Sequence, residues 1–129
     1  MSFCTAINCM DGRVQLPVIQ FLQDLFGVEY VDMITAPGPV RILAQQDNPP
    51  IVDAILERVA ISVQKHGSTQ IAVVAHHDCA GNPADRDAQV AQVRQSIDFL
   101  KGRFPQVEFE GLWVNENWDV EAVDLAEAT

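Results

Sequence analysis

Short apolar runs alternate with stretches of helical periodicity along this chain. Four runs, at residues 4–9, 28–34, 71–75 and 107–114, have the length and composition of strands. Between them, apolar residues recur at spacings of three and four in residues 18–26, 52–63 and 90–100, as they do along one face of a helix. This order predicts an α/β fold in which helices flank a central, mainly parallel sheet of about four strands, within a single domain spanning residues 1–129.

The ends of the predicted helices are marked by capping signals. Asn48 before Pro49 is a typical helix start, because asparagine caps a helix and proline loses nothing at the first position. Asn82 before Pro83 repeats this signal. Glycine commonly follows the last turn of a helix, and the three predicted helices are expected to end at Gly27, Gly67 and Gly102.

The strands and the remaining segments differ in their expected exposure. Residues 71–75 are apolar throughout, as in a strand that helices cover on both faces, and they predict the central strand. Residues 107–114 begin with alternating apolar and acidic side chains and predict an edge strand. Two prolines and a glycine within residues 36–39 predict a turn without regular structure. The acidic residues 116–129 predict either a short helix or a frayed tail.

Composition and charge exclude several classes of protein. With 48% hydrophobic and 20% charged residues, the 129-residue chain can form a core and does not resemble a disordered or low-complexity sequence. Its formal net charge of −10 repels nucleic acid and anionic lipid, so we expect neither as a partner. No apolar run approaches the roughly 20 residues that span a bilayer, which argues against a membrane protein.

The cysteines indicate the compartment. The sequence has three, an odd number, and its first residues show no secretory signal. We therefore expect a reducing, cytoplasmic location, in which the thiols are free or bind a metal and do not form a disulfide framework.

Two groups of chemically active residues follow predicted strands. Cys9, Asp11 and Arg13 come after the first strand, and His76 and Cys79 come after the strand at 71–75. Because ligand sites in open parallel sheets collect beyond the carboxyl ends of the strands, the two loops are expected to converge. Two thiolates and an imidazole suit zinc and leave a fourth tetrahedral position open, as in catalytic zinc sites. Considered alone, the same residues could equally be buried thiols and a hydrogen-bonded surface histidine.

The two motifs resemble the signature of a known family. The segment CMDGR, from Cys9 to Arg13, and the segment HHDC, from His76 to Cys79, are similar to those of the β-class carbonic anhydrases. That family has Cys-x-Asp-x-Arg after its first strand and His-x-x-Cys after its third, around one zinc ion. The resemblance covers roughly residues 3–114. It implies a zinc lyase in which zinc-bound hydroxide reversibly hydrates carbon dioxide to bicarbonate.

The resemblance also assigns roles to individual residues. It makes Cys9, His76 and Cys79 the zinc ligands, and it makes Asp11 and Arg13 the family's carboxylate and guanidinium pair. Held by two parallel hydrogen bonds from Arg13, Asp11 would accept a hydrogen bond from the zinc-bound hydroxide. Released from Arg13, Asp11 would occupy the fourth zinc position and close the site. Without the resemblance, the pair could be an ordinary surface ion pair.

Several neighbouring residues have two interpretations. His77 is either a proton shuttle, since histidine titrates near neutrality, or a simple loop residue. Asp78 either hydrogen-bonds a zinc ligand or stabilises the turn. Outside the motifs, we expect packing or capping roles for Cys4, His66, Trp113 and Trp118.

Around the expected cavity, the sequence departs from the family's usual residues. Met10 and Gly12 stand in place of serines, Ala80 replaces the glycine after the second cysteine, and residues 35–38 differ from the usual Arg-Asn-Ala-Gly. Three alternatives to carbon dioxide hydration therefore stay open. They are hydrolysis of carbonyl sulfide or carbon disulfide on the same metal, a non-catalytic zinc-binding or bicarbonate-sensing domain, and a metal-free α/β domain.

The resemblance implies a homodimer or a higher homo-oligomer. The first predicted strand begins close to Met1, so the helical arm that precedes it in many members of the family is not expected. We expect a second subunit to cover the surface that the arm would otherwise occupy.

Overall fold

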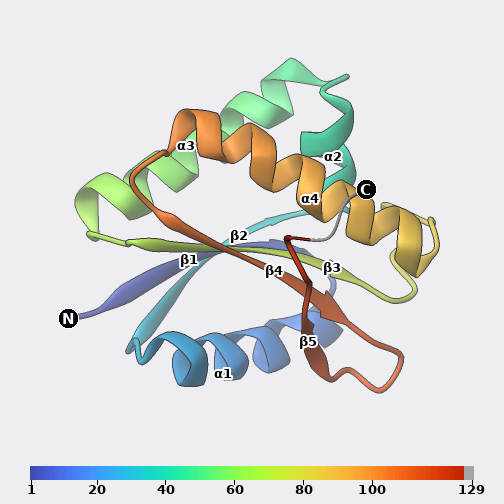
Figure 1. Ribbon diagram of the computed structural model, residues 1–129, viewed down its shortest axis with the longest axis horizontal. Coiled ribbons are helices and arrows are strands. Elements are labelled where there is room, and N and C mark those ends of the chain that lie inside the picture. The colour runs from blue at the N-terminus through green and yellow to red at the C-terminus, as the bar shows by residue number, and fades with distance from the viewer. Residues whose placement is uncertain (127–129) are drawn as a thin grey trace.

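The computed structural model describes residues 1–126, which form a sheet covered by helices on both faces (Figure 1). The strands are β1 (Phe3–Cys9), β2 (Tyr30–Ala36), β3 (Gln70–His76), β4 (Glu108–Val114) and β5 (Val120–Ala122). The helices are the 3₁₀ turn η1 (Gly12–Val14), α1 (Gln15–Phe26), α2 (Pro39–Gln45), α3 (Pro49–Lys65) and α4 (Arg86–Arg103).

The sheet has the strand order β2-β1-β3-β4-β5. The first four strands are parallel, and β5 runs antiparallel to β4. The α/β class and the mainly parallel sheet are thus confirmed, and β3 is the central strand, as its continuous apolar sequence predicts. Helix α1 covers one face, while α2, α3 and α4 cover the other (Figure 1).

Each face of the sheet has its own hydrophobic core. Beneath α1, Ala72 and Val74 of β3 pack with Val18 and Leu22. On the opposite face, the alternate β3 residues, with Val73 among them, pack in a cluster with residues of α2, α3 and α4. Because successive strand side chains point to opposite faces, a strand with a core on each side is apolar at every position.

Two segments form more structure than the sequence predicts. Residues 36–39 were expected to be irregular, but α2 begins at Pro39, directly after Gly38 in the left-handed conformation (φ 62°). Proline fits the first position of a helix, so the apparent breaker is a helix start. The expected short helix or frayed tail at 116–129 is also wrong for the described residues, which form a turn and β5; residues 127–129 lie outside the described part of the chain.

Several boundaries and one strand position differ from expectation. Helix α4 runs through Gly102, where it was expected to end, and ends at Arg103. Helix α4 begins at Arg86 rather than at Pro83, because the side chain of Asp85 accepts a hydrogen bond from the Ala88 amide (2.9 Å) and caps the helix. Strand β2 begins at Tyr30, two residues later than predicted. Helix α3 ends at Lys65, with His66 as its cap. Strand β4 lies at the edge of the sheet only in its first residues, because β5 pairs with residues 112–114 on its outer side.

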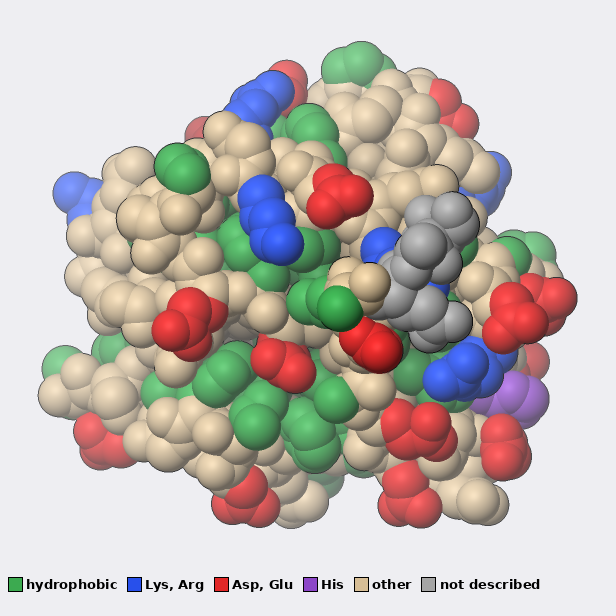
Figure 2. All heavy atoms as spheres, in the orientation of Figure 1, with side chains coloured by type: hydrophobic (Ala, Val, Ile, Leu, Met, Phe, Trp, Pro, Cys, Tyr) green, Lys and Arg blue, Asp and Glu red, His purple; other side chains and the backbone are tan. Residues whose placement is uncertain are grey.

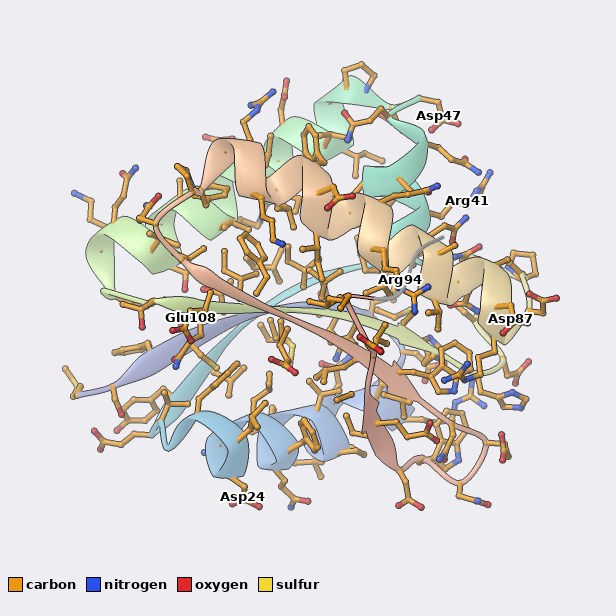
Figure 3. The ribbon with its side chains drawn as sticks, in the orientation of Figure 1. Asp24, Arg41, Asp47, Asp87, Arg94 and Glu108 are labelled. Atoms are coloured by element: carbon orange, nitrogen blue, oxygen red, sulfur yellow. The ribbon has the colours of Figure 1, made fainter. Side chains whose placement is uncertain are left out.

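Charged side chains lie mainly at the surface. Asp24, Asp47 and Asp87 point outward from the ribbon (Figure 3), and acidic side chains lie scattered over the face shown in Figure 2. Among residues 1–126, none of the helices combines the length and the apolar character needed to cross a bilayer.

The loops that follow β2 and β3 lie in close contact. A Cβ atom on Gly81 would lie 2.6 Å from the carbonyl carbon of Pro37, and one on Gly38 would lie 2.8 Å from the Cβ of Asn82. These glycines let the backbone of one loop approach the other, so the position of each loop depends on its neighbour.

We therefore expect Gly81→Ala to destabilise the protein by about 1–3 kcal/mol, because the added methyl group overlaps backbone that cannot move freely. Gly102→Ala is the matched control. Its Cβ would meet nothing within 4 Å, and alanine favours the interior of a helix such as α4, so stability should rise by up to about 1 kcal/mol. Urea unfolding of both variants tests this, and equal stabilities would contradict it.

Candidate metal centre

The predicted ligands come together at the carboxyl ends of two neighbouring strands. Cys9 is the last residue of β1, His76 is the last residue of β3, and Cys79 lies in the loop that follows β3. The sulfur atoms of the two cysteines lie 3.8 Å apart, and the three ligand atoms lie within 4.8 Å of one another. All three side chains are buried.

The orientation of His76 leaves one ring nitrogen available. Its Nδ1 lies 2.7 Å from the carbonyl oxygen of His77, to which it donates in the neutral ring. Nε2 is buried and has no hydrogen-bond partner within residues 1–126. A buried lone pair without a partner is costly, whereas a backbone carbonyl on the other nitrogen is the usual arrangement for a histidine that binds a metal.

The donor set fits zinc in type and in spacing. Zinc binds thiolate sulfur at about 2.3 Å, so two sulfurs on a tetrahedral ion lie roughly 3.8 Å apart. The observed separation of the Cys9 and Cys79 sulfurs is 3.8 Å. Three protein donors leave a fourth position for water or substrate.

The two cysteine thiols alter each other's pKa, and both also accept hydrogen bonds from backbone amides. The hydrogen bond between the two sulfurs lowers the pKa of Cys9 well below its ordinary value and raises that of Cys79. Backbone amides of Gly38 and Asp11 also lower the pKa of Cys9. Cys4 differs, because burial and the charge of Asp32 raise its pKa to about 11. The cluster thus favours a thiolate, the form that binds metal, whereas Cys4 stays protonated.

The loop after β1 is fixed by polar side chains that the sequence does not single out. Asn8 accepts a hydrogen bond from the Cys9 amide (2.9 Å) and donates to the carbonyl of Val14 (3.1 Å). Gln15 donates from Nε2 to the carbonyls of Cys9 and Asp11, both at 2.8 Å. The backbone from Cys9 to Asp11 is therefore held from both sides.

A buried glutamine holds the loop after β3. The Nε2 atom of Gln89, on α4, lies 3.0 Å from the carbonyl oxygens of His76 and Ala84 and 3.4 Å from that of Asn82. The sequence contains a signal for it, since Gln89 is a polar residue on the same helical stripe as the apolar Val93. Its partners could not be predicted, because they depend on how α4 packs on the sheet.

Asp11 and Arg13 form a two-pronged ion pair at the edge of the cluster. Nε of Arg13 donates to Oδ1 of Asp11 (3.0 Å), and Nη2 donates to Oδ2 (2.6 Å). The Arg13 amide donates to Oδ1 as well (2.9 Å). These hydrogen bonds lower the pKa of Asp11 to about 2 and keep its carboxylate on Arg13, outside the three-donor cluster.

Asp78 and Trp118 complete the environment of Arg13. Nη1 of Arg13 lies 3.3 Å from Oδ2 of Asp78, and Nη2 donates to the Asp78 carbonyl (3.2 Å). The Trp118 ring covers the guanidinium at 4.3 Å. The side chain of Asp78 thus contacts Arg13. Trp118, which was expected only to pack, also contacts the guanidinium of Arg13. Trp113 packs in the core, as expected.

His77 is exposed and lies apart from the three-donor cluster. Its backbone amide donates to Val114 (2.9 Å), and its side chain lines a separate cavity of about 400 Å³, together with Asp78 and Arg86. The two interpretations of His77, a proton shuttle or a simple loop residue, both stay predictions.

A small cavity adjoins the ligands. It has a volume of about 210 Å³ and a mainly apolar lining. The residues around it are Cys9, Met10, Asp11, Pro37, Ala80 and Gly81. One cavity therefore reaches both a predicted zinc ligand and the carboxylate held by Arg13.

Comparison with known proteins identifies the family of this chain. The family model described as "Putative carbonic anhydrase" matches residues 1–124, so the chain belongs to this carbonic anhydrase family. Curated protein sequences give no match. The resemblance of the two motifs to β-class carbonic anhydrases is thereby confirmed at the level of family and fold.

Solved structures share the fold at low sequence identity. The β-carbonic anhydrase CafA of Aspergillus fumigatus is 13% identical, with a TM-score of 0.57 over 98% of this chain and 77% of its own. A tetrameric β-carbonic anhydrase of Sordaria macrospora is 12% identical, with a TM-score of 0.62 over 98% of this chain and 82% of its own. A carbon disulfide hydrolase is 13% identical, with a TM-score of 0.52 over 93% of this chain and 78% of its own.

We expect the purified chain to bind one zinc ion and Cys79→Ala to bind it far more weakly. Loss of a direct ligand should cost more than the roughly 10- to 100-fold that is typical of losing a residue behind a ligand. Cys4→Ala is the matched control, because it removes a buried thiol outside the cluster. Metal analysis and competition with a chelator measure both, and equal zinc affinity in the two variants would contradict the assignment.

The Asp11–Arg13 pair should also contribute to acid stability. The folded-state pKa of Asp11 lies below its ordinary value of 3.8, so its contribution is present above that pH and is lost as pH falls toward about 2. In Asp11→Asn, the free energy of unfolding should change less steeply between these pH values than in the parent protein. Urea titrations of the zinc-free protein measure this. The exposed Asp53→Asn serves as control, and parallel curves for Asp11→Asn and the parent would exclude the contribution.

Proposed function

We propose that the protein is a zinc-dependent carbonic anhydrase that reversibly hydrates carbon dioxide to bicarbonate. The observation that carries this proposal is the cavity of about 210 Å³ that is bounded by both Cys9 and Asp11. This mainly apolar cavity has a size suited to a small substrate, and it borders both Cys9, one donor of the cluster, and Asp11, whose carboxylate Arg13 holds.

Cys9, His76 and Cys79 would hold the metal through two thiolates and Nε2 of the histidine. When bound, zinc would lower the pKa of a coordinated water and so make a nucleophile available near neutral pH. Gln89 holds the His76 carbonyl, and the His77 carbonyl holds Nδ1, so the ring is oriented before any ligand binds.

Asp11 would act as a hydrogen-bond acceptor rather than as a base. Its low pKa keeps the carboxylate ionised throughout the physiological range, so it does not retain a proton there. It would accept a hydrogen bond from the attacking oxygen and direct the lone pair of that oxygen toward carbon. Arg13 holds Asp11 by its own charge and prevents the carboxylate from turning toward the metal.

The lining of the cavity suits an uncharged substrate. Met10, Pro37 and Ala80 present apolar groups beside Cys9 and Asp11. Such a surface accepts carbon dioxide without a desolvation cost and favours release of the charged product, bicarbonate. The same lining would accept carbon disulfide or carbonyl sulfide, which makes these molecules the comparison substrates.

We also propose that the chain functions as a cytoplasmic homo-oligomer. Met10 and Leu16 expose 62% and 66% of their surface next to the candidate site, and such apolar side chains are suited to contact with a second subunit. The structural neighbour from Sordaria macrospora is tetrameric. A reducing compartment would keep the three free thiols available for metal binding.

The test is the carbon dioxide hydration rate of zinc-counted protein, measured by pH-indicator stopped flow at about pH 8.5. Asp11→Ala should keep its zinc and lose turnover by about 100-fold, since removing one positioned hydrogen-bonding group from the reacting atoms typically costs about that much. His76→Ala provides the background rate, and Asp53→Ala, on the exposed side of α3, should match the parent.

Two outcomes would reject the proposal. Turnover of the zinc-loaded parent no higher than that of His76→Ala would exclude a carbonic anhydrase, and release of hydrogen sulfide from carbon disulfide would then identify the alternative hydrolase. Full activity in Asp11→Ala would reject the role given to that carboxylate.

A further inference from the structure

Trp118 covers one face of the Arg13 guanidinium, whose edges are engaged by carboxylates. The edges of the guanidinium donate to Asp11 and to Asp78, and the indole ring lies over its plane at 4.3 Å from the ring centroid. An arginine can donate in its own plane and stack on an aromatic ring at the same time. Three side chains from three separate loops therefore fix one arginine.

The backbone of Trp118 shows that this placement is constrained. Trp118 has φ of 63°, in the left-handed region that bulky side chains rarely adopt. Such conformations persist where the surrounding structure determines them, and they cluster at functional sites.

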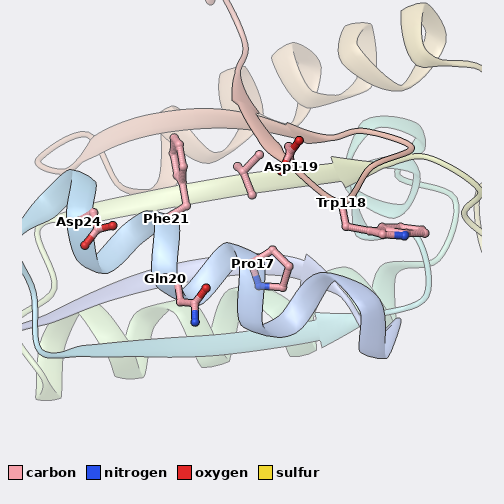
Figure 4. Close-up of a pocket in the computed structure, with 7 residues that line it drawn as sticks. Pro17, Gln20, Phe21, Asp24, Trp118 and Asp119 are labelled. Atoms are coloured by element: carbon pink, nitrogen blue, oxygen red, sulfur yellow. The ribbon is translucent and has the colours of Figure 1, made fainter.

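The turn between β4 and β5 holds Trp118 in this conformation. Its amide donates to the carbonyl of Asn115 (2.9 Å), and Oδ1 of Asn115 accepts from the amides of Asn117 (2.9 Å) and Asp119 (3.1 Å). In Figure 4 the Trp118 ring extends from this turn past the start of α1 and points away from Pro17 and Asp24. The turn thus directs an aromatic ring toward the candidate site.

We propose that Trp118 is a positioning residue that acts through Arg13 to keep Asp11 in its productive orientation. The proposal rests on the proposed function, in which Asp11 accepts a hydrogen bond from the attacking oxygen. Nearly half of the Arg13 side chain is exposed, at 46%, so hydrogen bonds to carboxylates alone leave it open to water. The ring covers the guanidinium on one face and restricts its rotation, and Asp11 follows because Arg13 holds both of its oxygens.

Trp118→Phe and Trp118→Leu form the decisive pair. Both keep a bulky apolar side chain and the same backbone strain, but only phenylalanine keeps an aromatic face for the guanidinium. Phe99→Leu is the matched control, because it removes a second cation–π contact, that of Arg103, from a site on α4 away from the cluster.

The first readout does not depend on activity. The Nε–H signal of Arg13, identified by its loss in Arg13→Lys, reports by its exchange with water how firmly Arg13 is held. In the zinc-loaded protein, exchange should be about two- to fivefold faster in Trp118→Leu than in Trp118→Phe, in line with the strength of an exposed cation–π contact. Zinc content and unfolding midpoint should be the same in the two variants, and Phe99→Leu should leave the exchange unchanged.

The second readout is turnover of carbon dioxide, in which kcat/KM should fall in Trp118→Leu by a similar factor and recover in Trp118→Phe. Equal exchange of the Arg13 signal in the two variants would overturn the inference, whatever the activity. Faster exchange with unchanged turnover in an active enzyme would overturn it too. A protein without carbon dioxide turnover would instead reject the proposed function, and Arg13 exchange would still decide whether Trp118 holds Arg13.

Discussion

The site depends on one backbone constraint, the parallel pairing of β1 with β3. The register aligns Ile7 with Val73, so Cys9 follows two residues beyond this pair on one strand and His76 three residues beyond it on the other. Two segments more than sixty residues apart in sequence are thereby brought to the same end of the sheet. The third donor, Cys79, needs only the tight turn after His76, in which Asp78 adopts φ of 58°. The register of β1 with β3 therefore sets the positions of two of the three donors.

Around the three donors, the protein uses polar side chains to hold backbone rather than to face a substrate. Asn8 and Gln15 fix the loop after β1, and Gln89 fixes the loop after β3. Each is buried or half-buried, so its hydrogen bonds are made in surroundings where losing one is costly. This arrangement leaves Nε2 of His76 as the single buried side-chain nitrogen or oxygen without a partner in residues 1–126. Because the surrounding buried polar side-chain atoms all have hydrogen-bond partners and Nε2 has none within the described residues, Nε2 is a candidate metal ligand.

The sequence predicts the elements and the donors because both leave local signals. The apolar run at 71–75 identifies the central strand, and Cys9, His76 and Cys79 stand at strand ends. The features that the sequence does not predict depend on contacts between segments that are distant in the chain. Helix α2 is hidden because its starting proline resembles a breaker, and Gln89 resembles any polar residue on a helix until α4 is placed on the sheet. The contact of Trp118 with Arg13 requires a left-handed residue in a turn that no short motif marks.

Strand β5 has a further consequence for how the protein behaves at high concentration. The outer edge of a sheet exposes unpaired amide and carbonyl groups that can recruit a strand from another molecule. On this side of the sheet, β5 pairs with residues 112–114 of the seven-residue β4 and replaces that part of the edge with three residues, in which Glu121 is exposed. A short edge that carries negative charge is a poor template for strand addition. The turn that places Trp118 over Arg13 therefore also protects one border of the sheet against aggregation.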